Sequence, residues 1–405
     1  EARLHDHKRF AVKAFARANN FDKIVMDSPT TRLGIITTGK AYLDVRQALN
    51  TLGIDDQRAA ALGIRVFKIG MSWPLDSVGL LSFARGLEEI LVIEEKRPLL
   101  EDQVKAQLYD LPESRRPRVI GKYDQEGQRV LCTAGILSPG EVAQFVGHRL
   151  LRFANDPTIR DRLDYLAARH DRRRNQAPVS ARTPYFCSGC PHNRSTKVPD
   201  GSRALAGIGC HYMALSMDRN TATFTQMGGE GASWVGQAPF TRTEHVFANL
   251  GDGTFIHSGS LAIRQALAAG VNITYKILFN DAVAMTGGQP PDGNPGVERF
   301  AQIVRAEGVD RIAVVSDEPE KYTNPSIFPA GTTIHHRDSL DPVQRELRAT
   351  PGVTVMIYDQ TCAAEKRRRR KRGTYPDPAK RVFINELVCE GCGDCSVQSN
   401  CQSVV

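Results

Sequence analysis

The sequence predicts an α/β protein with two doubly wound, mostly parallel-sheet domains and a short cysteine-rich tail. Short apolar runs suited to buried strands alternate with amphipathic stretches of helical length, and polar residues divide this alternation into two blocks. With 405 residues the chain is too long for one ordinary domain of about 150 residues. No apolar run approaches the roughly 18 residues that a membrane-spanning helix needs. We therefore expect two main domains and no membrane partner.

The first block, residues 1–150, alternates strand and helix signals and is predicted to be one α/β domain. Apolar runs predict buried strands at 33–38, 64–69 and 90–93. Amphipathic spacing predicts helices at 39–53, 81–87 and 99–111. Strands that alternate with helices in this way favour a parallel sheet.

Polar stretches separate the second block from its neighbours. Residues 151–183 are predicted to be a polar linker, and residues 184–365 a second α/β domain with strands at 245–250, 273–279, 311–315 and 353–358. Residues 366–380 begin with a basic run and continue with Gly and Pro, which predicts a basic linker. Residues 381–405 form the cysteine-rich tail. The chain begins with Glu1 and ends close behind a cysteine cluster, so we expect it to be an internal fragment of a longer polypeptide.

The net charge of +8 originates in one place. Seven of the 53 Lys and Arg residues lie between Lys366 and Arg372, and the remaining 46 face 45 acidic residues, which leaves +1. The bulk of the chain is therefore neutral, and we expect no nucleic-acid partner. The run itself is interpreted as a solvated linker, with attraction of an anionic partner as the alternative.

One pair of polar residues follows two neighbouring strands. Gly251-Asp252-Gly253 comes directly after strand 245–250, and Asn280 comes after strand 273–279, 28 positions beyond Asp252. Because one βαβ unit has about this length, both side chains should emerge at one carboxyl edge of the sheet. A carboxylate and an amide oxygen suit Mg²⁺, which completes its shell with phosphate and water, and the glycines let the backbone approach a diphosphate. An ordinary turn at a strand end is the alternative.

Eight of the nine cysteines fall into two groups. Cys389, Cys392 and Cys395 have the C-x2-C-x2-C spacing of an iron-sulfur motif, and Cys401, after a wider gap, serves the same or a second [4Fe-4S] cluster. The other group is Cys187, Cys190, Cys210 and Cys362, and it predicts a second [4Fe-4S] cluster near Asp252. Zinc remains an alternative for both groups, and inert buried thiols for the second. Without a secretory signal this pattern favours a reducing cytoplasm.

Longer phrases resemble a known family. The Gly-Asp-Gly motif with Asn280 resembles the thiamine diphosphate fingerprint. Together with the phrases at 187–193, 280–289 and 359–368, it is similar to the long, fused indolepyruvate ferredoxin oxidoreductases of bacteria, within the 2-oxoacid:ferredoxin oxidoreductase family. In that comparison residues 1–150 look like the transketolase-C-terminal-like domain, and the tail looks like the start of a ferredoxin-like domain.

The resemblance implies roles for individual residues. It implies Asp252, Asn280 and the carbonyl of Ala282 as magnesium ligands. Residues that would close over or lie beneath the cofactor are Thr286, Gly287, Gly288, Gln289, Gly228 and Gly229. His192 and His211 flank cluster cysteines and could bind the substrate carboxylate or move a proton, although loop histidines with satisfied hydrogen bonds are commoner.

The implied function is oxidative decarboxylation of an aryl 2-oxoacid, such as indolepyruvate, to an aryl-acetyl-coenzyme A with reduction of ferredoxin. The family's amino-terminal domain and the domain after the tail are not in this chain, so we expect no activity from it alone, and family habit implies a homodimer. Two alternatives remain: a non-oxidative thiamine diphosphate-dependent decarboxylase or carboligase with structural zinc, and a zinc-ribbon nucleic-acid binder.

Overall fold

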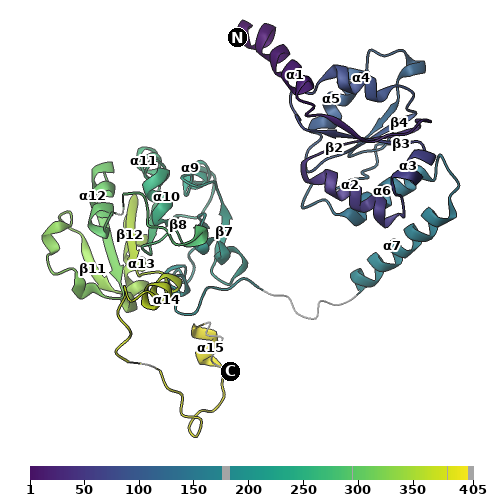
Figure 1. Ribbon diagram of the computed structural model, residues 1–405. Helices are drawn as coiled ribbons and strands as arrows, with labels where there is room; N and C mark the ends of the chain where they lie inside the picture. Colours follow the sequence, from purple (N-terminus) through teal and green to yellow (C-terminus); the bar gives the residue numbers. More distant parts are fainter. Residues whose placement is uncertain (176–182, 294, 381, 400–405) are drawn as a thin grey trace. The chain divides into compact units, whose positions relative to one another are not determined.

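The computed structural model of the chain describes residues 1–175, 183–293, 295–380 and 382–399 (Figure 1). Its contacts divide the chain into two compact units, residues 1–179 and 180–405. Each unit contains a mostly parallel sheet with helices on both faces, which confirms the predicted fold class. Within the described ranges, no helix is both long and apolar enough to cross a membrane.

The first unit is built on a five-stranded sheet in the order β1-β3-β2-β4-β5, counted over the described residues. Its strands are β1 (Lys23–Met26), β2 (Leu33–Thr38), β3 (Ile64–Ile69), β4 (Glu89–Ile93) and β5 (Arg118–Ile120). Strand β1 pairs antiparallel with β3, and the other pairs are parallel. Its helices are η1 (Arg3–Lys8), α1 (Arg9–Ala18), α2 (Gly39–Thr51), α3 (Asp56–Ala61), α4 (Ser77–Ala84), α5 (Leu99–Leu108), η2 (Glu113–Arg115), α6 (Pro139–Leu150) and α7 (Pro157–Asn175).

Two apolar cores cover the two faces of this sheet. Helices α2 and α6 pack against one face, and α4 and α5 against the other (Figure 1). The alternation along β2 explains this, since Ile35 belongs to the first core and its neighbour Ile36 to the second. The helix expected at 81–87 begins earlier, because the Asp76 carboxylate accepts the N–H of Gly79 and caps α4.

Helix α7 lies in the segment predicted to be a polar linker. Its sequence is rich in arginine, but Ile159, Leu163 and Leu166 recur at helical spacing and pack into the core with α2 and α6. Residues 157–175 are therefore helical, and at least the first half of α7 is part of the first unit. The remainder of the expected linker, residues 176–182, lies outside the described residues.

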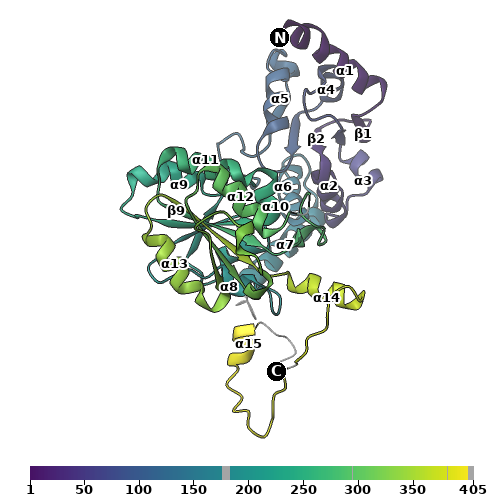
Figure 2. The ribbon, with the colours of Figure 1, turned by 90° about the vertical axis from the view of Figure 1, so that its left-hand side faces the viewer.

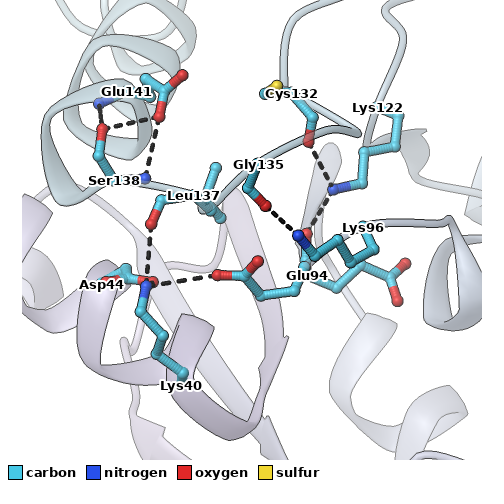
Figure 3. A network of polar contacts seen from close by, with 11 residues as sticks. Lys40, Asp44, Glu94, Lys96, Lys122, Cys132, Gly135, Leu137, Ser138 and Glu141 are labelled. Carbon is cyan, nitrogen blue, oxygen red and sulfur yellow. Dashed lines mark hydrogen bonds and ion pairs between the residues drawn. The ribbon is translucent and has the colours of Figure 1, made fainter. Parts of the chain in front are cut away.

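Lysine side chains close the carboxyl edge of the first sheet (Figure 3). Lys40, at the start of α2, donates from Nζ to the carbonyl of Leu137 at 2.9 Å. Lys122 is fully buried and donates from Nζ to the carbonyls of Glu94 and Cys132. Burial lowers the pKa of Lys122, and burial raises the pKa of the Glu94 carboxyl. Amines thus hold the 132–137 loop to the sheet, in addition to the burial of Leu137 in the apolar core.

The second unit contains a seven-stranded parallel sheet in the order β11-β10-β12-β9-β8-β6-β7, again counted over the described residues. Its strands are β6 (Ala204–Ala206), β7 (Thr221–Phe224), β8 (Val246–Gly251), β9 (Ile273–Phe279), β10 (Arg311–Ser316), β11 (Thr333–His336) and β12 (Val353–Asp359). The longer α-helices are α9 (Ala232–Gln237), α11 (Ser260–Ala269), α12 (Val297–Glu307), α13 (Leu340–Ala349), α14 (Ala363–Lys371) and α15 (Asp394–Ser399). The shorter α-helices and the other helical turns are α8 (His192–Ser195), η3 (Cys210–Ser216), η4 (Ala238–Phe240), α10 (Asp252–Thr254), η5 (Phe255–Gly259), η6 (Ala284–Thr286), η7 (Pro319–Lys321), η8 (Pro325–Ile327) and η9 (Arg337–Ser339).

Helices on both faces bury this sheet, and its central strands read as continuous apolar runs for that reason. Helices α9, α11 and α12 lie on one face and α13 on the other (Figure 2). Strands β8 and β9 are neighbours, paired from Val246 with Ile273 to Gly251 with Leu278. The chain therefore leaves both strands at the same edge of the sheet, as the sequence spacing predicts.

Most of the basic run is helical. It was expected to be a solvated linker, but helix α14 extends from Ala363 to Lys371. The helix begins four residues after Asp359, the last residue of β12. Beyond it, residues 374–393 have no helix or strand among those described.

Candidate cofactor site

Asp252 and Asn280 lie side by side at the carboxyl edge of the second sheet. The Asp252 carboxylate accepts the backbone N–H of Asn280 at 3.0 Å and that of Gly253 at 2.8 Å. Both side chains are buried. The side-chain oxygen Oδ1 of Asn280 is also buried, and none of the described residues donates a hydrogen bond to it. An amide oxygen without a partner beside a carboxylate is a donor set that suits a hard cation.

Burial determines the charge state of this carboxyl group. It raises the pKa of Asp252 to about 6, against the opposing effect of backbone hydrogen bonds from Asn280 and Gly253. A bound divalent cation would favour the ionised form and return the pKa toward its ordinary value.

A cavity of about 410 Å³ opens at this edge. The predicted residues that line it are His192, Cys210, His211, Gly251, Asp252, Gly253, Asn280, Ala282, Thr286 and Gln289. The lining also includes Met227, Met285 and Val283, so the space is polar at the strand ends and apolar opposite them. Such a cavity has the character of a small-molecule site.

The loop after Asn280 folds back over the cavity. The Val283 N–H donates to the Gln289 carbonyl at 2.8 Å, and the Gly288 N–H donates to the Val283 carbonyl at 3.0 Å. Gly287 and Gly288 have φ values of +122° and +82°, which glycine adopts without strain. These two glycines were predicted to contact the cofactor, but of the four residues 286–289, all described, only Thr286 and Gln289 line the cavity.

The glycine-rich loop at 227–231 lies beside the cavity rather than lining it throughout. Met227 is part of the lining, whereas Gly228 packs so tightly on Ser258 that a side chain there would collide with it. The buried Glu230 carboxylate accepts the Gly228 N–H at 2.7 Å, and burial raises its pKa. The sequence reasoning did not single out Glu230; the one signal was an acidic residue within a run of glycines.

His192 and His211 are brought together, with ring centroids 5.6 Å apart. Each is only 2% exposed, and burial lowers the pKa of His192 to about 3 and that of His211 to about 4. Both imidazoles are therefore neutral near neutral pH. As hydrogen-bonding groups they could still contact a substrate or move a proton, but neither offers a positive charge.

The four cysteines of the dispersed group also converge. Burial, together with smaller effects of the neighbouring Cys362, Cys187 and Cys210, raises the pKa of Cys190 to about 12. Cys210 lines the cavity, and Cys362 is buried at the start of α14. The structure thus brings near one another thiols that are separated by up to 175 positions in the chain.

The tail cysteines Cys389, Cys392 and Cys395 are exposed, and Cys401 lies outside the described residues. Over the described part of the chain, no three His, Cys, Asp or Glu side chains are close enough to share one metal ion. A cubic cluster differs from a single ion, because each of its thiolates binds a different iron atom. The cluster assignments remain predictions.

Comparison with known proteins identifies both units. Residues 23–173 match the indolepyruvate oxidoreductase domain, and residues 207–325 match the C-terminal TPP-binding domain of thiamine pyrophosphate enzymes. The fold and its sheet edge therefore define a thiamine diphosphate-binding enzyme domain. The chain thus contains an indolepyruvate oxidoreductase domain followed by a thiamine pyrophosphate-binding domain, which confirms the resemblance seen in the sequence.

The chain is similar to archaeal proteins named indolepyruvate oxidoreductase subunit IorA. The protein from Thermococcus kodakarensis is 26% identical over 92% of this chain, and that from Methanothermobacter marburgensis is 25% identical over 95%. The chain spans 55% and 61% of their respective lengths. Among solved structures, the 2-oxoglutarate:ferredoxin oxidoreductase from Magnetococcus marinus aligns with a TM-score of 0.35 and 18% identity, covering 51% of this chain and 75% of that one.

Proposed function

We propose that this chain supplies the thiamine diphosphate site of an enzyme that oxidatively decarboxylates an aryl 2-oxoacid to an aryl-acetyl-coenzyme A and reduces ferredoxin. The observation that supports it best is the buried Asn280 Oδ1, which lacks a hydrogen-bond partner among the described residues beside the Asp252 carboxylate. The relatives named indolepyruvate oxidoreductase favour an aryl substrate such as indolepyruvate.

The residues at the sheet edge fit the diphosphate end of the cofactor. Asp252, Asn280 and the carbonyl of Ala282 would hold Mg²⁺, which in turn binds the diphosphate. Gly253 lies so close to Val283 that a Cβ there would stand 3.1 Å from that side chain, so a larger residue would crowd the loop. Thr286 and Gln289 would close the cavity over the cofactor. When bound, thiamine diphosphate supplies the electron sink for the loss of carbon dioxide.

The apolar side of the cavity and its two neutral histidines would receive the substrate. Met227 and Met285 offer flexible apolar surface to an aryl ring. His192 and His211 would accept or donate hydrogen bonds at the substrate without adding charge.

The converging thiols fit an electron acceptor beside this cavity. We propose that Cys187, Cys190, Cys210 and Cys362 hold one [4Fe-4S] cluster, and that Cys389, Cys392, Cys395 and Cys401 contribute to another. Such clusters accept electrons singly and would pass them to ferredoxin. Thiolate ligands of this kind suit a reducing cytoplasm. In the full-length protein, which would be a homodimer, further domains would enclose the cofactor.

Anaerobic assay of the full-length protein tests this function. Viologen reduction would be followed with indolepyruvate, phenylpyruvate or pyruvate, with and without coenzyme A. We expect aryl substrates to be preferred and about eight or more iron atoms per chain, if two four-iron cubes are present. Preference for pyruvate would refute the aryl assignment. Loss of carbon dioxide from the oxoacid without viologen reduction, by protein that contains zinc in place of iron, would instead favour a non-oxidative decarboxylase or carboligase.

A further inference from the structure

The basic helix α14 makes specific contacts with the loop that follows Asn280. Arg369 forms an ion pair with the Asp281 carboxylate through one guanidinium nitrogen and donates to the Asp281 carbonyl at 3.1 Å through the other. Arg368 donates to the carbonyl of Gly287 at 2.9 Å. Both ends of the 281–287 loop are therefore held by adjacent arginines of one helix.

The loop also packs directly against the helix surface. Glu365 is buried on the first turn of α14 and forms an ion pair with Arg368. The Gly288 backbone lies so close to both side chains that a Cβ atom at Gly288 would overlap them. A solvated linker would have no such contacts, so the basic run has a structural partner at the sheet edge.

Asp281 is the residue on which the geometry of this loop depends most. It lies between Asn280 and Ala282, two proposed magnesium ligands, and has a φ of +59°, a left-handed conformation that is uncommon for residues other than glycine. The surrounding structure must stabilise such a conformation for it to persist. Arg369 stabilises it by donating to the side-chain oxygen and to the carbonyl oxygen of Asp281 together. A planar guanidinium can reach both oxygens at once, whereas a single ammonium cannot.

The start of α14 is fixed to the same loop through the backbone. The Cys362 N–H donates to the Asn280 carbonyl at 2.9 Å, and the Gln360 N–H donates to the Phe279 carbonyl at 3.1 Å. Helix α14 is thus tied to the metal-ligand segment at Cys362, the residue before its first turn, and again two turns later at Arg369.

We propose that Arg369 and Arg368 are positioning residues, which hold the 280–288 loop in the conformation that presents Asn280 Oδ1 and the Ala282 carbonyl to the cation of the cofactor. This inference rests on the proposed thiamine diphosphate site. The other basic residues of the run have a different role, since Arg370 contacts Tyr375 and the Pro376 carbonyl, outside the loop.

The test compares variants of equal charge in the full-length protein. Arg369→Ala and Arg370→Ala each remove one positive charge from α14, but only Arg369→Ala removes contacts to the loop. We expect Arg369→Ala to weaken Mg²⁺-dependent thiamine diphosphate binding by about tenfold, as the loss of an outer partner of a metal ligand does, and Arg370→Ala to change it less than about twofold. Arg369→Lys, which keeps the charge but only one contact, should resemble Arg369→Ala. Isothermal titration calorimetry measures all three.

Hydrogen exchange of the amides at 281–289 without cofactor provides an independent readout. Faster exchange in Arg369→Ala than in Arg370→Ala supports the positioning role, and equal exchange and equal affinity in the two variants overturn it. If the wild-type protein itself does not bind thiamine diphosphate, the proposed function fails, while the exchange comparison still decides whether Arg369 orders the loop. Equal binding by Arg369→Lys and wild type would show that charge alone matters and would refute the two-contact geometry.

Discussion

The backbone N–H of Asn280 donates a 3.0 Å hydrogen bond to the carboxylate of Asp252, which lies 28 residues earlier in the chain. The bond orients the Asp252 carboxylate, and it leaves the Asn280 side-chain oxygen without a hydrogen-bond donor among the described residues. It exists because β8 and β9 pair in register up to Gly251 with Leu278, so that the chain leaves both strands at the same edge of the sheet. One backbone contact thus prepares two oxygen ligands for the same cation.

Replacing Asn280 should therefore affect cofactor binding far more than folding. Asn280→Ala removes one proposed magnesium ligand, and we expect thiamine diphosphate affinity at fixed Mg²⁺ to fall by roughly 100-fold. The free energy of unfolding without cofactor should change by less than about 1 kcal/mol, because Oδ1 accepts no bond from the described residues. Calorimetric titration and urea unfolding measure the two quantities.

Asn272→Ala is the matched control for that prediction. Asn272 lies at the opposite end of β9, where its Oδ1 accepts the Gly352 N–H at 2.8 Å. Its replacement should lower stability by about 1 kcal/mol and leave cofactor affinity unchanged. Equal cofactor affinity in the Asn280 and Asn272 variants would contradict the assignment of Asn280 as a ligand.

The sequence could predict that Asp252 and Asn280 lie at one edge of the sheet, because the apolar strand pattern and the length of a βαβ unit determine where the chain leaves each strand. Cys362 was placed at the same edge by the same reasoning, and the structure puts it within hydrogen-bond distance of Asn280 through its backbone. In contrast, the amino-acid composition of α7 and α14 led to a wrong prediction for both segments. Their arginines suggested solvated linkers, whereas Ile159 packs into a core and Arg369 pairs with Asp281. The helical spacing of Ile159, Leu163 and Leu166 is a local signal that the arginine-rich composition obscured, whereas the pairing of Arg369 with Asp281 has no local signal in the chain.

Glu230 and Gly288 show a second limit of sequence reasoning. A glycine-rich phrase predicts a turn, but not which backbone groups the turn presents to solvent, ligand or protein. Gly288 needs to be glycine because of the Glu365 side chain, which lies 77 residues away. Glu230 satisfies the Gly228 N–H from inside the loop, a local contact that becomes visible only with the backbone conformation.

Gly288→Ala should destabilise the second unit more than an alanine at another left-handed glycine. Gly288 and Gly293 have φ values of +82° and +73°, so both substitutions should cost about 1 kcal/mol from backbone strain. Only at Gly288 would the added methyl group overlap Glu365 and Arg368, whereas the space at Gly293 is open. We expect an additional loss of about 1–2 kcal/mol and weaker cofactor binding for Gly288→Ala alone. Urea unfolding of both variants checks this, and equal losses would contradict the packing described.

The first unit offers a comparison between a buried and an exposed lysine. Lys122→Ala removes an amine that donates to two carbonyls from a fully buried position, and we expect the free energy of unfolding to fall by about 2–4 kcal/mol. Lys96→Ala removes a donor to the Gly135 carbonyl in the same loop, but from an exposed position, and should cost less than about 1 kcal/mol. Similar losses in the two variants would show that the 132–137 loop does not depend on Lys122.

His245 gives the second unit a dependence of stability on pH that can be isolated. It is buried before β8, its Nε2 lies 2.8 Å from the Thr274 hydroxyl, and burial, with a smaller effect of Arg348, lowers its pKa from 6.5 to about 4. Above pH 6.5 the imidazole is neutral in both states and adds no pH dependence. Below pH 6.5 His245 binds a proton in the unfolded chain but not in the folded chain. The free energy of unfolding therefore falls by up to about 1.4 kcal/mol per pH unit until about pH 4.

His192 and His211 act in the same direction, so the wild type alone cannot separate the three contributions. Urea unfolding of His245→Gln across this interval should show a shallower fall than the wild type, by roughly 3 kcal/mol in total, whereas His148→Gln, at an exposed position on α6, should follow the wild-type curve. Parallel curves for all three proteins would mean that His245 is protonated as readily in the folded state as in the unfolded one.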